Sequence, residues 1–216
     1  MRQGSDQGVL IGVCGIDGAG KTTLISALRE WAPLSEARVQ KLKPGANYQR
    51  LMRGIPDPWA DLDALFGSQL ARSMGWAEVF DFLSYHDHQV RPALRTPSVV
   101  LHDRWTPCFA AFCDSVLGLG GLAAPRLRRV TAADLVLYLD VSPVTALERI
   151  RRTRDPNPDE DIAVLRAFRA GYEEALCDPD YPVVRIGELP AGEVARIARD
   201  SVAQIAGNRL EYVAGG

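Results

Sequence analysis

The chain has 216 residues, with 25 Lys and Arg against 27 Asp and Glu, so its formal net charge is −2. This length fits one domain that can bury a full core, and the near-neutral charge argues against a general nucleic-acid-binding protein. No apolar run is long enough to cross a bilayer, and the polar start MRQGSDQG lacks the apolar segment of a signal peptide, so we expect a cytoplasmic protein with no membrane or nucleic-acid partner.

The first half of the chain alternates between apolar strands and helical patterns. The run VLIGVC predicts a buried strand over 9–14, and Leu24, Ile25 and Leu28 recur at helical spacing within a predicted helix over 21–31. The segment ARVQKLK predicts a second strand over 37–43, ended by a Pro-Gly turn. Residues 58–90 have a mostly helical pattern.

The second half continues the alternation. Strands are predicted over 97–105, 134–140 and 181–186, and helices follow Ser142, begin at Ile162 and cover 193–205. Ser142 can cap its helix, with a proline in the first turn. The charged, proline-broken stretch RTRDPNPDED predicts a loop, and we expect disorder over 1–8 and a frayed tail within 207–216.

This alternation predicts an α/β fold in which parallel strands are joined by right-handed crossovers. Ligands of such sheets bind at the carboxyl ends of the strands. The loop after the first strand, Asp103 and Asp140 should therefore lie near one rim of the sheet.

The stretch GIDGAGKTT, residues 15–23, matches the pattern G-x-x-x-x-G-K-[ST] between a predicted strand and a predicted helix. Glycines let backbone N–H groups approach phosphate oxygens, and the helix N-terminus adds positive potential. Lys21 can bridge the outer phosphates, and the Thr22 hydroxyl can bind Mg²⁺. We expect an ATP site made of Gly15, Asp17, Gly18, Ala19, Gly20, Lys21, Thr22 and Thr23.

Asp17 stands inside this loop, where an inward carboxylate would repel a triphosphate. It can instead point outward to a hydroxyl or an amine of a second substrate. The alternative is an aspartate that only stabilises the turn.

Four segments together resemble the thymidylate kinase family of P-loop nucleoside monophosphate kinases, in the same order and over nearly the whole chain: GIDGAGKTT, VVLHDRW, DLVLYLDVSPVTALERIRRTR and AFRAGYEEAL. The resemblance implies a three-layer P-loop NTPase fold, a five-stranded parallel sheet flanked by helices, with a small lid. It implies a single P-loop kinase domain over 1–216 with its lid at 151–161, and a possible homodimer. Family members transfer the γ-phosphate of ATP to a deoxynucleoside monophosphate, usually dTMP.

The resemblance also implies roles for individual residues. Lys21 would hold the outer phosphates, Thr22 and Asp103 would serve Mg²⁺, and Asp17 would contact the sugar hydroxyl of the acceptor. Arg104 would grip the acceptor phosphate. Because position 18 is glycine, the lid arginines Arg151, Arg152 and Arg154 are expected to supply the positive charge, with a solvated helix end as the alternative.

The acceptor site departs from the family pattern. Lys43 and Pro44 stand where the family has Glu-Pro, Phe82 falls where it has a base-reading Arg, and Phe112 replaces a Tyr in its Ala-Tyr-Gln motif. We expect Asp17, Lys43, Pro44, Phe82, Arg104 and Phe112 to border the acceptor, although Phe82 also suits a core position. Losing base-reading donors weakens selection for thymine, so we hypothesise a different acceptor or relaxed specificity.

Several polar residues predict structure rather than chemistry. The lid acids Asp155, Asp159, Glu160 and Asp161 suit a solvated hinge and a helix start, and His102 suits a packed neutral imidazole. The scattered cysteines suit small buried thiols.

Three functions stay open at this point. The first is a kinase for a small-molecule nucleotide acceptor such as dTMP, using ATP and Mg²⁺. The second is a kinase of the same fold for a modified nucleotide, a nucleoside or another alcohol, and the third is a nucleotide-binding regulator that has lost turnover.

Overall fold

The computed structural model describes residues 8–34, 36–43, 58–157 and 160–214, with the backbone alone for 32, 58–68 and 206–214. In chain order its elements are β1 (Val9–Cys14), α1 (Lys21–Arg29), η1 (Ala32–Leu34), β2 (Arg38–Lys41), α3 (Pro58–Tyr85), η2 (His86–Val90), α4 (Arg91–Leu94), β3 (Val99–Asp103), α5 (Thr106–Ala111), η3 (Phe112–Val116), α6 (Ala124–Leu127), β4 (Leu135–Leu139), α7 (Pro143–Arg151), α8 (Ile162–Ala175), β5 (Val183–Ile186) and α9 (Ala191–Ala214).

The five strands form one parallel sheet in the order β2-β3-β1-β4-β5. Every residue of the three central strands is buried, because helices cover both faces of the sheet, and this explains their nearly continuous apolar sequences. The edge strands β2 and β5 are more exposed. The predicted five-stranded parallel sheet is confirmed.

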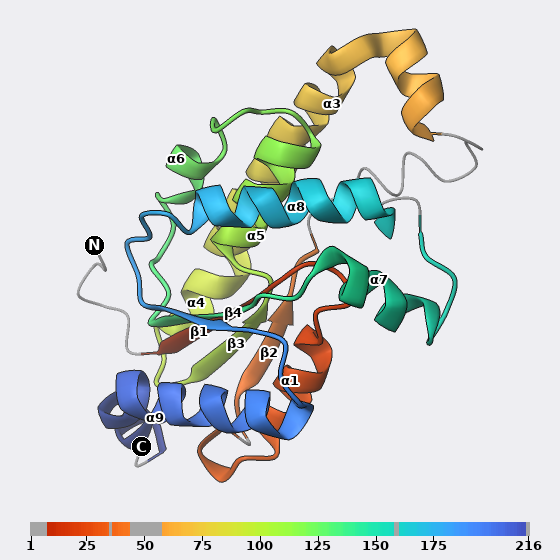
Figure 1. The fold of residues 1–216 in the computed structure, drawn as a ribbon. Helices are drawn as coiled ribbons and strands as arrows, with labels where there is room; N and C mark the ends of the chain where they lie inside the picture. Colours follow the sequence, from red (N-terminus) through yellow and green to blue (C-terminus); the bar gives the residue numbers. More distant parts are fainter. Residues whose placement is uncertain (1–7, 35, 44–57, 158–159, 215–216) are drawn as a thin grey trace.

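Helices form a layer on each side of the sheet (Figure 1). Helices α1 and α9 pack against each other and against the central strands on one side, and α8 packs on α5 on the other. The predicted three-layer α/β architecture is therefore correct. No helix in the described part of the chain has the length and apolar character needed to span a bilayer.

The ends of three helices bear on the sequence predictions. The Ser142 hydroxyl accepts a hydrogen bond from the amide of Thr145 at 3.1 Å and caps α7, as expected. The carboxylate of Asp161 caps α8 in the same way, through the amide of Ala163 at 2.8 Å. Helix α9 continues to Ala214, beyond the predicted end at 205, because the added residues include good helix formers and no proline.

Residues 1–7 of the predicted disordered start lie outside the described residues, whereas the amide of Gly8 donates to the carbonyl of Leu94 at 2.9 Å.

Three of the cysteines are buried as expected, but Cys177 is exposed. His102 is fully buried among aromatic rings, and this burial lowers its pKa to about 4, so the imidazole is neutral at physiological pH.

Candidate active site

The loop between β1 and α1 depends on glycine because it is bent and closely packed. Gly15, Gly18 and Gly20 have φ angles of 144°, 79° and 98°, the region that side chains disfavour. A Cβ at Gly15 would lie 2.8 Å from the carbonyl oxygen of Leu139, and one at Gly18 would lie 2.3 Å from that of Ala146. The loop is thus pressed between the end of β4 and the start of α7.

Lys21, at the first position of α1, folds back over this loop. Its ammonium donates to the carbonyls of Gly15 at 2.9 Å and Ile16 at 2.7 Å. Burial and the nearby Arg104 lower the pKa of Lys21, and Asp17 opposes them, so that the pKa lies at about 8. The ammonium is therefore held at the mouth of the loop by neutral carbonyls, which an anionic phosphate can replace.

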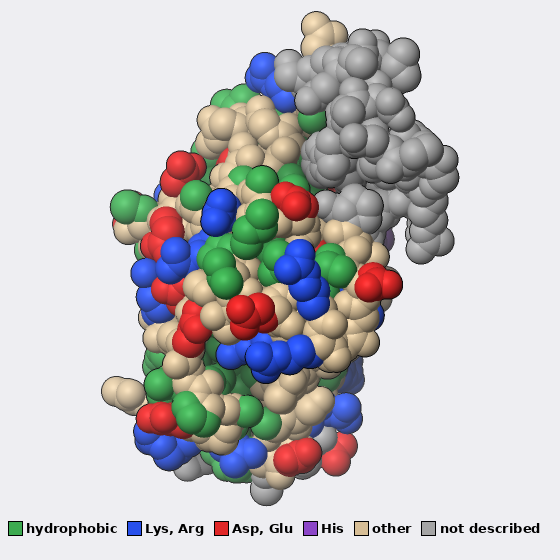
Figure 2. Space-filling view, turned by 45° about the vertical axis from the view of Figure 1, so that its right-hand side comes forward, with side chains coloured by type: hydrophobic (Ala, Val, Ile, Leu, Met, Phe, Trp, Pro, Cys, Tyr) green, Lys and Arg blue, Asp and Glu red, His purple; other side chains and the backbone are tan. Residues whose placement is uncertain are grey.

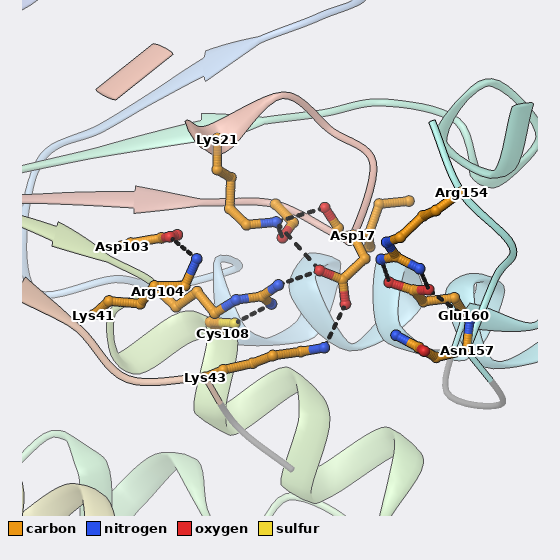
Figure 3. A network of polar contacts seen from close by, with 12 residues as sticks. Asp17, Lys21, Lys41, Lys43, Asp103, Arg104, Cys108, Arg154, Asn157 and Glu160 are labelled. Atoms are coloured by element: carbon orange, nitrogen blue, oxygen red, sulfur yellow. Dashed lines mark hydrogen bonds and ion pairs between the residues drawn. The ribbon is translucent and has the colours of Figure 1, made fainter. Parts of the chain in front are cut away.

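Asp17 forms ion pairs with three cationic side chains that come from three parts of the chain (Figure 3). It forms a close ion pair with Arg104, and its carboxylate oxygens lie 3.7 Å from the ammonium of Lys43 and 3.9 Å from that of Lys21. Burial raises the pKa of Asp17, but these three cations outweigh it and hold the pKa well below its usual range. The carboxylate stays ionised, and the corner around it carries an excess of positive charge.

Arg104 reaches this corner through an unusual backbone turn. It has a φ of 80°, a conformation that residues other than glycine rarely adopt, and its amide donates to the carbonyl of Val13 at 2.9 Å. The buried guanidinium also donates to the thiol of Cys108 at 3.5 Å. Strain of this kind persists where surrounding contacts fix it, and it is concentrated at functional sites.

Asp103 ends β3 level with Lys41 of β2, because the parallel register pairs these two residues. The ammonium of Lys41 lies 2.8 Å from Oδ2 of Asp103. The other oxygen, Oδ1, is buried and has no hydrogen-bond partner among the residues that the structure describes. An unpaired buried carboxylate oxygen beside the loop is a suitable place for a cation or for a water bound to one.

A cleft of about 370 Å³ joins these groups. Its walls come from the loop, from the ends of β2 and β3, from α7 and from the lid. The lining residues are Asp17, Gly18, Gly20, Lys21, Thr22, Thr23, Lys41, Asp103, Arg104, Arg149, Ile150, Thr153 and Arg154. Most of the predicted loop residues and one predicted lid arginine therefore meet in one space.

A second hollow of about 560 Å³ adjoins the cleft and shares Gly20, Thr23 and Arg149 with it. Ala19 also lines it, and its other walls are one face of α1, the first turns of α9 and Leu189 just before that helix. Arg149 stands between the two spaces and donates to the carbonyl of Ala19 at 3.5 Å. No role was predicted for Arg149 from the sequence. It lies about one helical turn after Ala146, and Ala146 is the residue of α7 that packs against Gly18 of the loop.

Other predicted residues lie elsewhere. Arg151 and Arg152 are exposed, and Arg152 pairs with Glu148 at 3.9 Å. Neither of them lines the cleft. Phe82 and Phe112 are buried in the core, where they pack on other aromatic rings, and Pro44 lies outside the described residues.

Tyr172 of α8 is a further residue at this site, and no role was predicted for it from the sequence. Its buried hydroxyl accepts a hydrogen bond from the amide of Gly15 at 3.1 Å and donates to the carbonyl of the same residue at 3.2 Å. It thereby fixes the start of the loop to α8. The sequence predicted the helix that begins at Ile162, but it gave no sign of the partner of this hydroxyl.

Glu160 corrects the expectation of a solvated lid. The residue is fully buried, and its carboxylate binds both terminal nitrogens of Arg154, at 2.7 Å and 2.5 Å. Nearby residues of the lid, such as Asp155, are exposed as expected. Sequence composition could not separate this glutamate from its acidic neighbours, because only the folded chain brings Arg154 against it.

Known proteins resemble this chain over most of its length. The model of a family described as thymidylate kinase matches residues 13–195. A thymidylate kinase of Halorhodospira halophila is 30% identical over 213 residues, covering 93% of this chain and 96% of that protein. A probable thymidylate kinase of Pyrobaculum calidifontis is 28% identical over 198 residues (87% and 92%), and a thymidylate kinase of Xanthomonas oryzae is 32% identical over 177 residues (77% and 72%).

The matched region contains the loop, the Asp103–Arg104 pair and the lid, which are the parts that line the cleft. The chain therefore belongs to the thymidylate kinase family, and it is an ATP-dependent nucleoside monophosphate kinase.

Proposed function

We propose that the cleft transfers the γ-phosphate of ATP to a nucleoside monophosphate, with dTMP as the first acceptor to consider. The observation that carries this proposal is the convergence of Lys21, Arg104 and Arg154 on one cleft from the loop, from the end of β3 and from the lid. Phosphoryl transfer needs little covalent help from a protein and depends on alignment and on neutralising charge. Two anionic substrates can approach each other only if cations lie between them.

The donor half of the site would use the loop and the adjoining hollow. Backbone amides of the loop and the N-terminus of α1 would hold the phosphates, with Lys21 moving from its carbonyl partners to the outer ones. The nucleoside of ATP would occupy the second hollow, beside the flat guanidinium of Arg149 and the apolar Leu189. The overlap of the two spaces at Gly20 and Thr23 supports a single extended ligand.

Mg²⁺ fits the oxygen groups next to the phosphates. In the described part of the chain no three His, Cys, Asp or Glu side chains are placed to hold a metal ion by themselves. This is compatible with Mg²⁺, which usually takes one or two protein ligands together with substrate phosphates and waters. The Thr22 hydroxyl and Asp103, through its unpaired Oδ1, would hold the ion, which would neutralise charge on the phosphates.

The acceptor phosphate would lie near the corner that Arg104 and Asp17 form. Arg104 is buried and carries a planar fork of donors that matches a phosphate. Asp17, held ionised by its cations, would accept a hydrogen bond from a sugar hydroxyl.

One observation favours an acceptor with additional negative charge. Lys43 lies 3.7 Å from Asp17, so an ammonium stands beside the position proposed for the sugar hydroxyl. A modified monophosphate with a second anionic group near its sugar would use this charge. This second candidate keeps the same donor half and the same reaction.

An ADP-release assay with a panel of monophosphates tests both candidates. We expect ATP- and Mg²⁺-dependent turnover, and we expect Arg104→Ala to raise the KM for the acceptor at least about 30-fold, because truncating a charged hydrogen-bonding partner costs about 2–5 kcal/mol. The exposed Arg152→Ala is the matched control and should leave that KM nearly unchanged. ATP binding without transfer to any acceptor would instead support a non-catalytic regulator.

Preference within the panel decides between the acceptors. A clear preference for dTMP would argue against the more anionic acceptor. Conversely, a preference for a monophosphate with a second anionic group that disappears in Lys43→Ala would support it.

A further inference from the structure

We infer that Glu160 is a positioning residue that fixes the lid guanidinium of Arg154 at the wall of the cleft before any substrate binds. This inference rests on the proposed function, because it assigns Arg154 to the transferring phosphate. Glu160 does not itself line the cleft, and Arg154 is the cleft-lining residue that its carboxylate binds.

The surroundings of Glu160 differ sharply from those of the lid around it. The lid residues from Arg151 to Asp155, most of which are charged, are exposed. Glu160, which follows them in the sequence, is completely buried. Figure 2 shows Lys and Arg side chains mixed with Asp and Glu side chains over the face that it presents, as is ordinary for a solvated surface. A carboxylate that leaves such a surface for the interior is retained only where it is fully hydrogen-bonded.

Both oxygens of Glu160 are used. Oε2 accepts from Arg154 Nη1 at 2.7 Å and from the amide of Asn157 at 2.8 Å, and Oε1 accepts from Arg154 Nη2 at 2.5 Å. The amide of Glu160 donates in turn to the carbonyl of Asn157 at 2.9 Å. Figure 3 shows Arg154, Glu160 and Asn157 together with the contacts between them. One buried side chain therefore holds both the backbone at Asn157 and the guanidinium of Arg154.

The two-pronged geometry determines what Glu160 does to Arg154. A bidentate pair between a carboxylate and a guanidinium fixes the plane of the guanidinium as well as its distance. Arg154 also donates to the carbonyl of Asp155 at 2.9 Å, and it lines the same cleft as Lys21 and Arg104. A flexible arginine would have to be ordered during the reaction, whereas this one is ordered beforehand.

Orientation of this kind affects the chemical step more than substrate binding. Misplacing a charge-stabilising group by about 1 Å can reduce the rate about 100-fold. Loss of an interaction made mainly in the transition state lowers kcat and leaves KM little changed. We therefore expect Glu160→Gln, which keeps the size of the side chain but removes its charge, to reduce kcat about 10- to 100-fold.

The test is a double-mutant cycle measured by ADP release with ATP, Mg²⁺ and the best acceptor of the panel. If Glu160 acts through Arg154, Glu160→Gln lowers kcat strongly in the wild-type background, changes the KM for ATP less than about threefold, and adds less than about twofold in the Arg154→Ala background. Glu160→Asp, which keeps the charge, should restore part of the lost kcat.

The matched control is Asp161→Ala. It removes the neighbouring carboxylate and the cap of α8, but not the contact with Arg154. We expect a lower melting temperature with kcat unchanged. Equal losses of kcat from Glu160→Gln in both backgrounds, or no loss at all, would overturn the inference.

Hydrogen–deuterium exchange on the ligand-free protein gives a readout that does not need activity. Amides around Asn157 should exchange faster in Glu160→Gln than in the wild type or in Asp161→Ala, and unchanged exchange would count against the inference. If the wild-type protein transfers phosphate to no acceptor, the proposed function fails, and the exchange experiment still decides whether Glu160 orders the lid.

Discussion

Gly18 is the point at which the loop and the lid-bearing helix meet, and replacing it with alanine tests that contact. A Cβ at this position would lie 2.3 Å from the carbonyl oxygen of Ala146 and 2.8 Å from its carbonyl carbon. Both atoms belong to the backbone of α7, so no side-chain rotation relieves the overlap. The helix would have to move away from the loop.

The size of the effect follows from two contributions. A left-handed backbone with a Cβ costs about 1–2 kcal/mol, and overpacking in a tight contact typically costs about 1–3 kcal/mol. We therefore expect Gly18→Ala to lower the free energy of unfolding by about 2–5 kcal/mol. Since α7 carries Arg149 into the cleft, the turnover of ATP should fall as well.

Gly20→Ala is the matched control for stability. Gly20 also has a positive φ, 98°, but a Cβ there would meet nothing within 4 Å. Only the backbone cost applies, together with the same small entropic effect on the unfolded chain that any Gly→Ala change brings. Gly18→Ala should therefore be less stable than Gly20→Ala by about 1–3 kcal/mol.

Urea unfolding followed by circular dichroism measures this difference, with melting temperatures as a second readout. In a chain of this length, each kcal/mol corresponds to about 2–4 °C. Equal stability of the two variants would show that α7 is not pressed against the loop at Gly18, and the reasoning about the loop and the lid would then be wrong.

Two pH dependences follow from the buried titrating groups. Because the pKa of Lys21 is lowered to about 8, kcat/KM for ATP should be level below pH 8 and should fall about tenfold per unit above it; a pH–rate profile that stays level to pH 10 would contradict this. His102 has its pKa lowered from 6.5 to about 4, so only the unfolded chain is protonated between these values, and stability should fall by about 3 kcal/mol as the pH drops through this range. Urea unfolding at pH 7 and pH 4 should show that His102→Leu lacks this part of the loss, and an unchanged pH dependence would refute it.

Much of the fold could be predicted from local sequence. The strand Val9–Cys14 was predicted with its bounds, because a short apolar stretch that is rich in β-branched residues and lies between glycines favours a buried strand over a helix. The loop that follows was equally clear, since its glycines, Lys21 and Thr22 are adjacent in sequence. A binding site whose residues all lie within one short segment can be predicted without a structure.

The arrangement across the cleft was decided by the tertiary structure alone. Lys41 was not assigned a role in the sequence, and only the parallel register of β2 and β3 places it against Asp103. Phe82 was considered for the acceptor, but it packs in the core. Whether a side chain on an amphipathic helix points inward or toward a ligand depends on the neighbours that the fold supplies.

Glu160 shows the same limit most clearly. In the sequence it is one of four acids in a charged, proline-broken segment, and such segments are ordinarily solvated. In the folded chain it is buried against Arg154, six residues away, because the lid turns back on itself. Sequence patterns therefore determined the fold and the phosphate-binding loop, and the resemblance of four segments to a known family indicated the class of reaction. Burial and pairing of charges depend on contacts between separate segments, so they were decided only when the chain folded.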